Sequence, residues 1–335
     1  MQRAPMQRVG PLAFLPQALA EFDVPLGDVL SGSGIAAGDL VPEARLPMPA
    51  LLAILERAAV LTGCPTLGLR LGAGLDHRVL GAMGELMTRA PTLGDALRDY
   101  VGLQLGYSRS ATVYLQRMGE DYALGYGIYD GPSPGGRQVY DLVLAIGCNF
   151  VRNLTEGKAR PVRILQCCRL PQDPAAHIGV LRAPVLFDQE QCCIVLSPGD
   201  MARPLPGADP AERTRLRNLM RNQARGDLDD LSARVRHVLR PRLMTGESGR
   251  DHVARELAVS TRTLARQLAA RGTSFEDIKD QVRGTVAREL LALTTLPVGR
   301  VAEALDYTTH SAFNHAFQRW TGTTPSRWRA ARSEA

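Results

Sequence analysis

The sequence VARELAVSTRTLARQLAARG (residues 253–272) is repeated in outline by VAEALDYTTHSAFNHAFQRWTG (residues 301–322). The second copy has one more residue in its centre. Each copy begins with a short helical pattern that contains a small residue, Ala254 or Ala302. A small side chain there lets the first helix cross a second one closely, as in a helix-turn-helix unit. The stretch therefore predicts two such units, at about 250–271 and 298–321.

The second helix of each unit has a capped start and two different faces. Ser260 and Thr309 stand at the expected N-cap positions, 49 residues apart. The apolar residues that follow have i, i+4 spacing and should hold the helix to a core: Leu264 and Leu268, then Phe313 and Phe317. The opposite face has side chains that can donate to base edges and phosphates: Arg262, Arg266 and Gln267, then His310, Ser311, Asn314 and His315.

Two copies are much harder to explain by chance than one, because a single helical hairpin is common. A long helix, about Phe275–Leu293, should join them. The competing interpretation is an all-helical oligomerisation domain or a helical repeat protein. It is disfavoured because only two copies are present, whereas a solenoid needs about three.

Charge is unevenly divided along the chain. The net charge is +6, with +8 in residues 211–335 and −2 in residues 1–210. A basic C-terminal part on a faintly acidic body suggests that one part meets a polyanion. A solvated basic face would produce the same numbers, so charge supports the argument without deciding it.

The two repeated stretches resemble a known family. The two copies are similar to the two halves of the AraC/XylS DNA-binding domain, and the pattern F-x-R-W-T-G-x-T-P-x-x-W-R, residues 317–329, matches its signature. The resemblance implies recognition helices in two successive major-groove segments. It implies that Thr261, Arg262, Ala265 and Arg266 read the first, and His310, Ser311, Asn314 and His315 the second. The full predicted DNA-binding set adds Ser260, Gln267, Thr309 and Arg319.

Some positions leave alternatives open or depart from the family. Arg319, Arg327 and Arg329 either contact the DNA backbone or pack the final turn. Asp306 stands in the second turn where the family usually has Gly, and Asp tolerates left-handed angles better than most residues. His315 replaces an Arg found in many members, which predicts mildly pH-sensitive contacts there.

The first two thirds of the chain mix helical and strand patterns. Helices are expected between Pro47 and Gly63, at about His77–Thr88 and at Thr92–Leu105. A β-hairpin of Ala111–Arg117 and Tyr122–Tyr129 follows. The later elements are expected as helix Arg137–Glu156, strand Val162–Cys168, helix Pro174–Leu181 and strand Gln191–Leu196. The fold class is thus α+β: a helical front with a small α/β sheet, then an all-α double helix-turn-helix domain.

A linker is expected where Pro and Gly gather, at Leu205–Pro210. The predicted domains are an effector-binding and dimerisation domain, 1–205, a linker helix, 206–226, and the DNA-binding domain, 227–332. Sparse strands do not suit the jelly-roll sugar pocket of the arabinose regulator itself. Residues 20–205 instead resemble, more loosely, the N-terminal domain of the branch that includes ornithine-utilisation-type regulators.

That resemblance implies an effector in an apolar pocket between helices and sheet. The candidate lining residues, each equally compatible with plain core, are Tyr100, Tyr107, Tyr126, Tyr129 and Cys148. No nucleophile, base and orienting group fall into order around Asp76, His77 and Glu85, so no catalytic residue and no cofactor are expected.

Six cysteines occur without zinc-site spacing, so no metal is expected. In the doublets Cys167–Cys168 and Cys192–Cys193, one member of each should pack inward as a small hydrophobe. Two other function classes stay open: a DNA-repair methyl-acceptor fused to a regulator, and an architectural DNA-binding protein without a ligand. Redox sensing by the paired cysteines also stays open.

No segment approaches the ~20 apolar residues of a membrane helix, and no secretory signal is evident in residues 1–20. A cytoplasmic location is expected. The expected partners are double-stranded DNA, a small-molecule effector, a second copy of the chain and RNA polymerase. The effector, the operator and the direction of regulation are left open.

Overall fold

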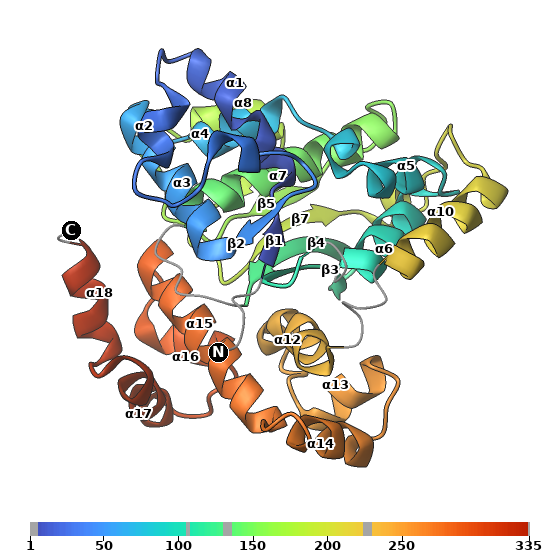
Figure 1. Cartoon of the computed structure of the whole chain (residues 1–335). Coiled ribbons are helices and arrows are strands. Elements are labelled where there is room, and N and C mark those ends of the chain that lie inside the picture. The colour runs from blue at the N-terminus through green and yellow to red at the C-terminus, as the bar shows by residue number, and fades with distance from the viewer. Residues whose placement is uncertain (1–5, 105–107, 130–135, 224–229, 334–335) are drawn as a thin grey trace.

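The computed structural model describes residues 6–104, 108–129, 136–223 and 230–333 (Figure 1). An N-terminal part is built on a five-stranded sheet, and a C-terminal part consists of helices in the residues described. The expected α+β fold class is confirmed. None of the described helices has the length and apolar character needed to cross a membrane.

The five-stranded sheet has the order β3-β4-β7-β5-β6. Its strands are β3 (Ala111–Met118), β4 (Asp121–Ile128), β7 (Cys192–Leu196), β5 (Arg163–Leu165) and β6 (Val185–Leu186). Neighbours run antiparallel except β5 and β6, which are parallel. The β3–β4 hairpin predicted from the alternating pattern is confirmed, with Met118 opposite Asp121 and Gly119 at φ 62° in the turn. β5 is shorter than predicted and ends at Leu165.

One face of the sheet is covered by α7 (Gly136–Leu154), whose predicted helix is confirmed. α3 (Met48–Leu61) and α4 (Leu67–Ala73) pack against α7 in turn. α3 follows Pro47 and ends before Gly63, as the sequence predicts. The apolar side of the sheet is therefore buried beneath two layers of helices, first α7 and then α3 and α4.

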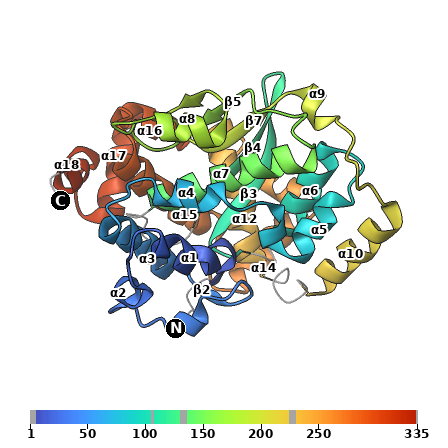
Figure 2. The same ribbon diagram turned by 90° about the horizontal axis from the view of Figure 1, so that it is seen from above.

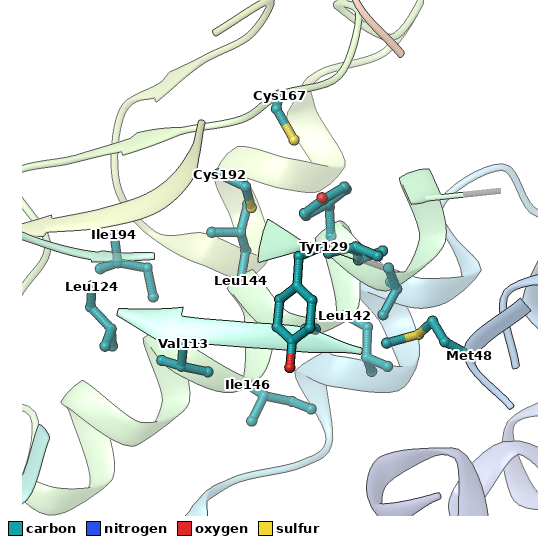
Figure 3. Close-up of a cluster of buried hydrophobic side chains, with 14 of the residues drawn as sticks. Met48, Val113, Leu124, Tyr129, Leu142, Leu144, Ile146, Cys167, Cys192 and Ile194 are labelled. Carbon is teal, nitrogen blue, oxygen red and sulfur yellow. The ribbon is translucent and has the colours of Figure 1, made fainter. Parts of the chain in front are cut away.

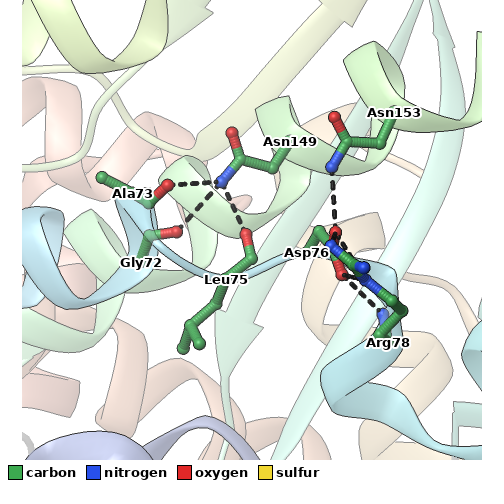
Figure 4. A network of polar contacts seen from close by, with 7 residues as sticks. All are labelled: Gly72, Ala73, Leu75, Asp76, Arg78, Asn149 and Asn153. Atoms are coloured by element: carbon green, nitrogen blue, oxygen red, sulfur yellow. Dashed lines mark hydrogen bonds and ion pairs between the residues drawn. The ribbon is translucent and has the colours of Figure 1, made fainter. Parts of the chain in front are cut away.

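Amide side chains of α7 fasten the end of α4 (Figure 4). Asn149 Nδ2 donates to the carbonyl of Leu75 at 2.5 Å and to two carbonyls at the end of α4. Asn153 donates to Asp76 at 3.0 Å, and Asp76 also pairs with Arg78 at 2.5 Å. The bonds from Asn149 satisfy backbone carbonyls at the end of α4 and just beyond it. Asp76 is thus occupied by structural contacts.

Residues 6–8 and 45–47 form a small two-stranded sheet that the sequence pattern does not predict. β1 (Met6–Arg8) pairs antiparallel with β2 (Arg45–Pro47). Between them lie short helical pieces: η1 (Gly10–Phe14), α1 (Leu15–Ala20), α2 (Leu26–Leu30) and η2 (Ala37–Asp39).

The single helix predicted over 77–88 is wrong in one respect. The structure divides it into η3 (His77–Leu80) and α5 (Ala82–Thr88) at Gly81, whose φ is 59°. The next helix, α6 (Leu93–Leu103), begins where predicted. Its cap Thr92 accepts a hydrogen bond from the backbone N–H of Asp95 at 3.1 Å.

Beyond the sheet lie α8 (Ala175–Leu181), α9 (Pro198–Met201) and α10 (Pro210–Gln223). α10 falls in the segment expected as a linker helix, yet it packs against α5 and α6. Arg213 of α10 pairs with the buried Asp99 of α6 at 2.6 Å. α10 lies at one margin of the molecule, opposite the last two helices (Figure 2).

The prediction that one cysteine of each doublet packs inward is wrong, because both members of each are buried. Cys192 faces the α7 side of the sheet, and Cys193 packs with Ala123, Leu165 and Val195 on the other side. Burial raises the pKa of the Cys192 thiol to about 11 and that of Cys193 to about 12.

The C-terminal part contains α12 (Leu231–Arg242), η5 (Leu243–Thr245), α13 (Arg250–Glu256), α14 (Thr261–Ala269), α15 (Phe275–Leu293), α16 (Val298–Ala304), α17 (His310–Thr321) and α18 (Pro325–Ser333). α12 and α15 pack against the N-terminal part (Figure 1). Arg240 of α12 is buried, donates to the Ile128 carbonyl at 3.0 Å, and pairs with Glu289 of α15 at 2.7 Å.

Candidate functional site

The first helix-turn-helix unit is made by α13 and α14. Ser260 caps α14 by accepting a hydrogen bond from the Thr263 N–H at 3.1 Å. Leu264 and Leu268 are fully buried, and Ala254 is buried where α13 meets α14. The predicted cap and apolar stripe are therefore present, and they fix one face of α14 to the core.

The second unit, α16 and α17, has the same construction. Thr309 accepts from the Ala312 N–H at 3.2 Å. Phe313 and Phe317 are fully buried, and the rings of Phe317 and Trp328 form a T-shaped pair with centroids 5.8 Å apart. The final helix α18 thereby closes the core of this unit through an aromatic contact.

The turn of the second unit holds Asp306 at φ 61°. Its carboxylate accepts hydrogen bonds from Ser248 at 2.5 Å and from Lys279 at 3.2 Å, and Arg283 lies at 3.3 Å. Partial burial works against ionisation, but these hydrogen bonds and charges outweigh it and lower the pKa of Asp306. Asp306 thus ties the second turn both to α15 and to the segment before α13.

α15 separates the two units and sets their distance. Its start carries a capping box in which Ser274 and Asp277 exchange hydrogen bonds. Its 19 residues span about 28 Å at ~1.5 Å per residue. α15 contacts both α14 and α17, so it holds the second helices of the two units in a fixed relation to each other.

α14 and α17, called the reading helices below, lie on the side of the C-terminal part away from the sheet (Figure 1). Of the twelve predicted contact residues, nine are exposed and three, Thr261, Gln267 and Asn314, are half-buried. The nine exposed ones are Ser260, Arg262, Ala265, Arg266, Thr309, His310, Ser311, His315 and Arg319. In the part of the chain described, neither Arg262 nor Arg266 has a carboxylate partner.

The arginines that follow behave differently from one another. Arg319 pairs with Asp280 of α15 at 2.5 Å, and Trp320 donates to the same carboxylate at 2.8 Å. Arg329 is half-buried and donates to the Leu291 carbonyl at 3.3 Å. Arg327 is exposed. Arg329 therefore has a packing contact, while Arg327 faces solvent.

An apolar cavity of about 100 Å³ lies between the sheet and α7. The wall of this cavity includes Val113 and Leu124 of the sheet and Ile146 of α7, which lie in one cluster of buried hydrophobic side chains (Figure 3). Of the five residues predicted to line an effector pocket, Tyr100 and Tyr126 line this cavity. Tyr129 and Cys148 are buried but are not among its lining residues, and Tyr107 lies outside the described residues.

Sequence reasoning missed the polar side chains at the cavity. Gln7 and Arg8 reach it from β1, and Gln104 reaches it from the end of α6. Nothing in the sequence pattern marks Gln7 and Arg8, because β1 is three residues long and its partner β2 is distant in the chain. Gln104 stands at the C-cap of a predicted helix, where the pattern does not distinguish it from a solvent-facing residue.

Comparison with known proteins gives consistent matches. A family model described as the arabinose-binding domain of AraC transcription regulator, N-terminal, matches residues 24–205. A model of a helix-turn-helix domain matches residues 253–331.

Two relatives are similar over most of their length. The HTH-type transcriptional regulator VirS of Mycobacterium tuberculosis is 29% identical over 292 residues, covering 86% of this chain and 85% of VirS. The ornithine utilization regulator of Pseudomonas aeruginosa is 27% identical over 312 residues, covering 87% of this chain and 86% of that protein. The crystal structure of the transcriptional regulator CdpR from Pseudomonas aeruginosa aligns at 25% identity with a TM-score of 0.43, over 91% of this chain and 96% of that one.

Proposed function

The chain belongs to the AraC family of DNA-binding transcription regulators, and from that premise we propose that its two reading helices bind consecutive major-groove segments of an operator. The observation that carries this proposal is the pair of capped helices that both lie on the side of the C-terminal part away from the sheet, with their predicted contact residues exposed or half-buried (Figure 1). The predicted domain limits, 1–205, 206–226 and 227–332, are retained, with α10 in the linker segment packed on the N-terminal part.

Affinity and specificity have separate sources in this proposal. Arg262 and Arg266 carry charges that are free to meet phosphates or guanine edges, and they supply part of the salt-dependent affinity. In α17 the half-buried Asn314 has the amide that reads adenine bidentately, and His310, Ser311 and His315 surround it on the exposed face. Arg319 joins the interface at the end of α17, where its pairing with Asp280 limits its reach.

The N-terminal domain is a ligand domain of the arabinose-binding type by family, and we propose that its effector occupies the cavity between the sheet and α7. Tyr100 and Tyr126 contact the effector, and Tyr129 and Cys148 belong to the surrounding core. Tyr107 is retained as a lining candidate from the sequence.

The relatives named above are transcriptional regulators, which supports a regulatory and not an enzymatic role. The buried cysteines favour the same choice over a methyl-acceptor protein, because the pKa of each doublet thiol is raised, which disfavours the nucleophilic thiolate. Burial is the main cause for Cys167, Cys192 and Cys193, and for Cys168 the hydrogen bond with Cys167 comes first and burial second. A promoter-bound regulator adjoins RNA polymerase, our proposed protein partner, in the cytoplasm. A homodimer would read two sites and gain affinity by making the second contact intramolecular.

The test is in vitro footprinting of genomic DNA with the purified full-length protein. The expected result is a set of protected sites whose protection is strongest in two major-groove segments on one face of the duplex. The variant Arg262→Ala should weaken protection of one segment. The matched control Arg98→Ala removes the same charge from an exposed residue of α6 and should change nothing. Protection without two segments, or equal footprints for both variants, would contradict the assignment.

A further inference from the structure

We propose that the cavity accepts a compact, uncharged and mostly apolar molecule whose one polar group hydrogen-bonds to the side-chain oxygen of Gln104. This inference rests on the proposed function, since it names the chemical class of the effector for the same cavity. It depends on three observations: the apolar residues of the wall, the pairing of Arg8 with Glu43, and the buried Gln104 oxygen that has no hydrogen-bond partner among the described residues.

The wall of the cavity is apolar on most sides. The sheet contributes Val113, Leu124 and Ile194, and the helices contribute mainly aliphatic side chains and the rings of Tyr100 and Phe150. None of the described residues that line it is acidic. An ammonium group brought into this space would lose its hydration without meeting a counter-charge, which strongly disfavours cationic ligands.

Arg8 is the one described lining residue that carries a full charge at neutral pH, and that charge is already engaged. Its terminal nitrogen pairs with Glu43 at 2.6 Å, and its Nε donates to the Pro42 carbonyl at 2.9 Å. A carboxylate ligand would have to compete with Glu43 for the charge of Arg8. The wall therefore disfavours anions as well as cations.

Gln104 supplies the polar contact. Its side chain is buried, and its Oε1 atom has no hydrogen-bond partner in the part of the chain described. The neighbouring Gln7 differs, because its Oε1 accepts from Ser108 and its Nε2 donates to the Arg8 carbonyl at 3.1 Å. A buried acceptor without a partner is unfavourable. A ligand hydroxyl or amide N–H that reaches Gln104 relieves this, so the position selects molecules with one donor.

Size narrows the class further. A dry protein cavity of about 150 Å³ holds benzene. The cavity here is about 100 Å³, two thirds of that volume, so a ligand the size of benzene, with six non-hydrogen atoms, is the upper limit. Cyclopentanol stands at this limit, has one hydroxyl group and no charge, and is a suitable probe.

The experiment measures binding to the full-length protein by isothermal titration calorimetry at pH 7. The four probes share one ring: cyclopentanol, cyclopentane, cyclopentylamine (a cation) and cyclopentanecarboxylate (an anion). We expect cyclopentanol to bind at least tenfold more tightly than either charged analogue. Gln104→Leu should weaken cyclopentanol binding about tenfold and leave cyclopentane binding unchanged, which also reports that the variant is folded.

A second variant tests the location. Val143 lines the cavity from α7 and is only half-buried, so Val143→Phe fills space at the wall. It should abolish binding of both cyclopentanol and cyclopentane. Where Gln104→Leu does not fold, this variant supplies the test. Cyclopentanol binding that survives Val143→Phe overturns the proposal, because the alcohol would then bind elsewhere.

Tight binding of the amine or of the carboxylate overturns the proposed class. Carboxylate binding strengthened by Glu43→Gln would assign the polar contact to Arg8 instead of Gln104. The failure of the proposed function looks different: an intact preference for cyclopentanol together with no operator footprint overturns the DNA-reading assignment alone. An intact footprint with no preference among the four probes overturns the ligand class alone.

Discussion

Arg262 and Asn314 occupy corresponding faces of the two reading helices, one exposed and one half-buried. If each contacts a base edge, Arg262→Ala and Asn314→Ala should each reduce the free energy of specific binding by about 1–3 kcal/mol. Binding to unrelated DNA should change much less for Asn314→Ala than for Arg262→Ala, because only the arginine carries charge. Fluorescence anisotropy with specific and unrelated duplexes at fixed salt measures both. Equal specific affinity of wild type and both variants would count against base reading.

Asp306 departs from the family pattern, and its contribution to stability can be tested by substitution. Because its folded-state pKa is lowered, its charge contributes stability above the unfolded pKa of ~3.9, and the contribution is lost as pH falls through the lower folded value. Asp306→Asn keeps a residue that tolerates the left-handed angle. At pH 7 it should lower the free energy of unfolding by only about 0.5 kcal/mol, because the carboxylate is more than a third exposed and screened.

Urea denaturation at pH 7 and near pH 3 measures this difference for Asp306. The gap between wild type and Asp306→Asn should shrink at the lower pH. An equal gap at both values would mean that the charge is not responsible. The position itself could be predicted from the sequence, but its partners could not, because Ser248, Lys279 and Arg283 lie 23 to 58 residues away in the chain.

At the scale of elements, the N-caps of the reading helices carry a direct prediction. Ser260→Ala and Thr309→Ala each remove an acceptor for an N–H at the start of α14 or α17. Each should cost about 1 kcal/mol of stability and weaken specific DNA binding, because the first turn that presents the contact residues loses order. Ser31→Ala is a suitable control, since no described hydrogen bond uses its hydroxyl. Denaturation curves that are equal for Ser260→Ala and Ser31→Ala would contradict the assignment.

Elements whose ends are marked by capping, Pro or Gly residues could be predicted from the sequence. α15 has the predicted bounds because Ser274 and Asp277 form a capping box, and α3 lies between Pro47 and Gly63 as expected. β1 and β2 could not be predicted, because each is three residues long and is stabilised by its distant partner. The break at Gly81 could not be predicted, because an isolated glycine is tolerated within a helical pattern. In the structure its φ of 59° interrupts the helical hydrogen bonds.

The cysteine doublets show where pattern reasoning fails for lack of tertiary context. Neighbouring side chains along a strand point to opposite faces of the sheet. The prediction that one cysteine packs inward therefore takes the other face of the sheet to be exposed to solvent. Both faces of the strand that holds Cys192 and Cys193 are covered, so both thiols are buried. Two-sided coverage depends on packing between distant segments, which no local pattern records.

At the scale of the whole molecule, the packing of α12 and α15 on the N-terminal part had no counterpart in the sequence analysis. Gly127 of β4 makes room for it, because a Cβ atom there would lie 3.0 Å from the Arg240 guanidinium. Three polar contacts extend the junction: Arg169 N–H to the Leu293 carbonyl, Thr295 N–H to Asp188, and Arg300 to Glu190. The ligand domain and the DNA-binding helices are therefore one packed unit in this structure.

The buried Arg240–Glu289 pair makes that junction testable. Arg240→Met leaves the Glu289 carboxylate buried without its counter-charge and should cost about 3–5 kcal/mol, whereas the double variant Arg240→Met/Glu289→Met should recover most of the loss. Burial already raises the pKa of Glu289, with Arg240 opposing that rise, so losing Arg240 raises it further. A carboxyl with a raised folded-state pKa destabilises the fold as pH rises from the unfolded value of ~4.3 towards the folded one.

The cost of Arg240→Met should therefore be smaller at pH 5 than at pH 8, and the double variant should show no such difference. Urea denaturation of the full-length variants at the two pH values measures it. Hydrogen exchange should rise in β4 and α12 of the single variant, because Arg240 also donates to the Ile128 carbonyl and so holds the two elements together. A double variant as unstable as the single one would mean that Arg240 acts through its contacts with the sheet and not through the charge of Glu289.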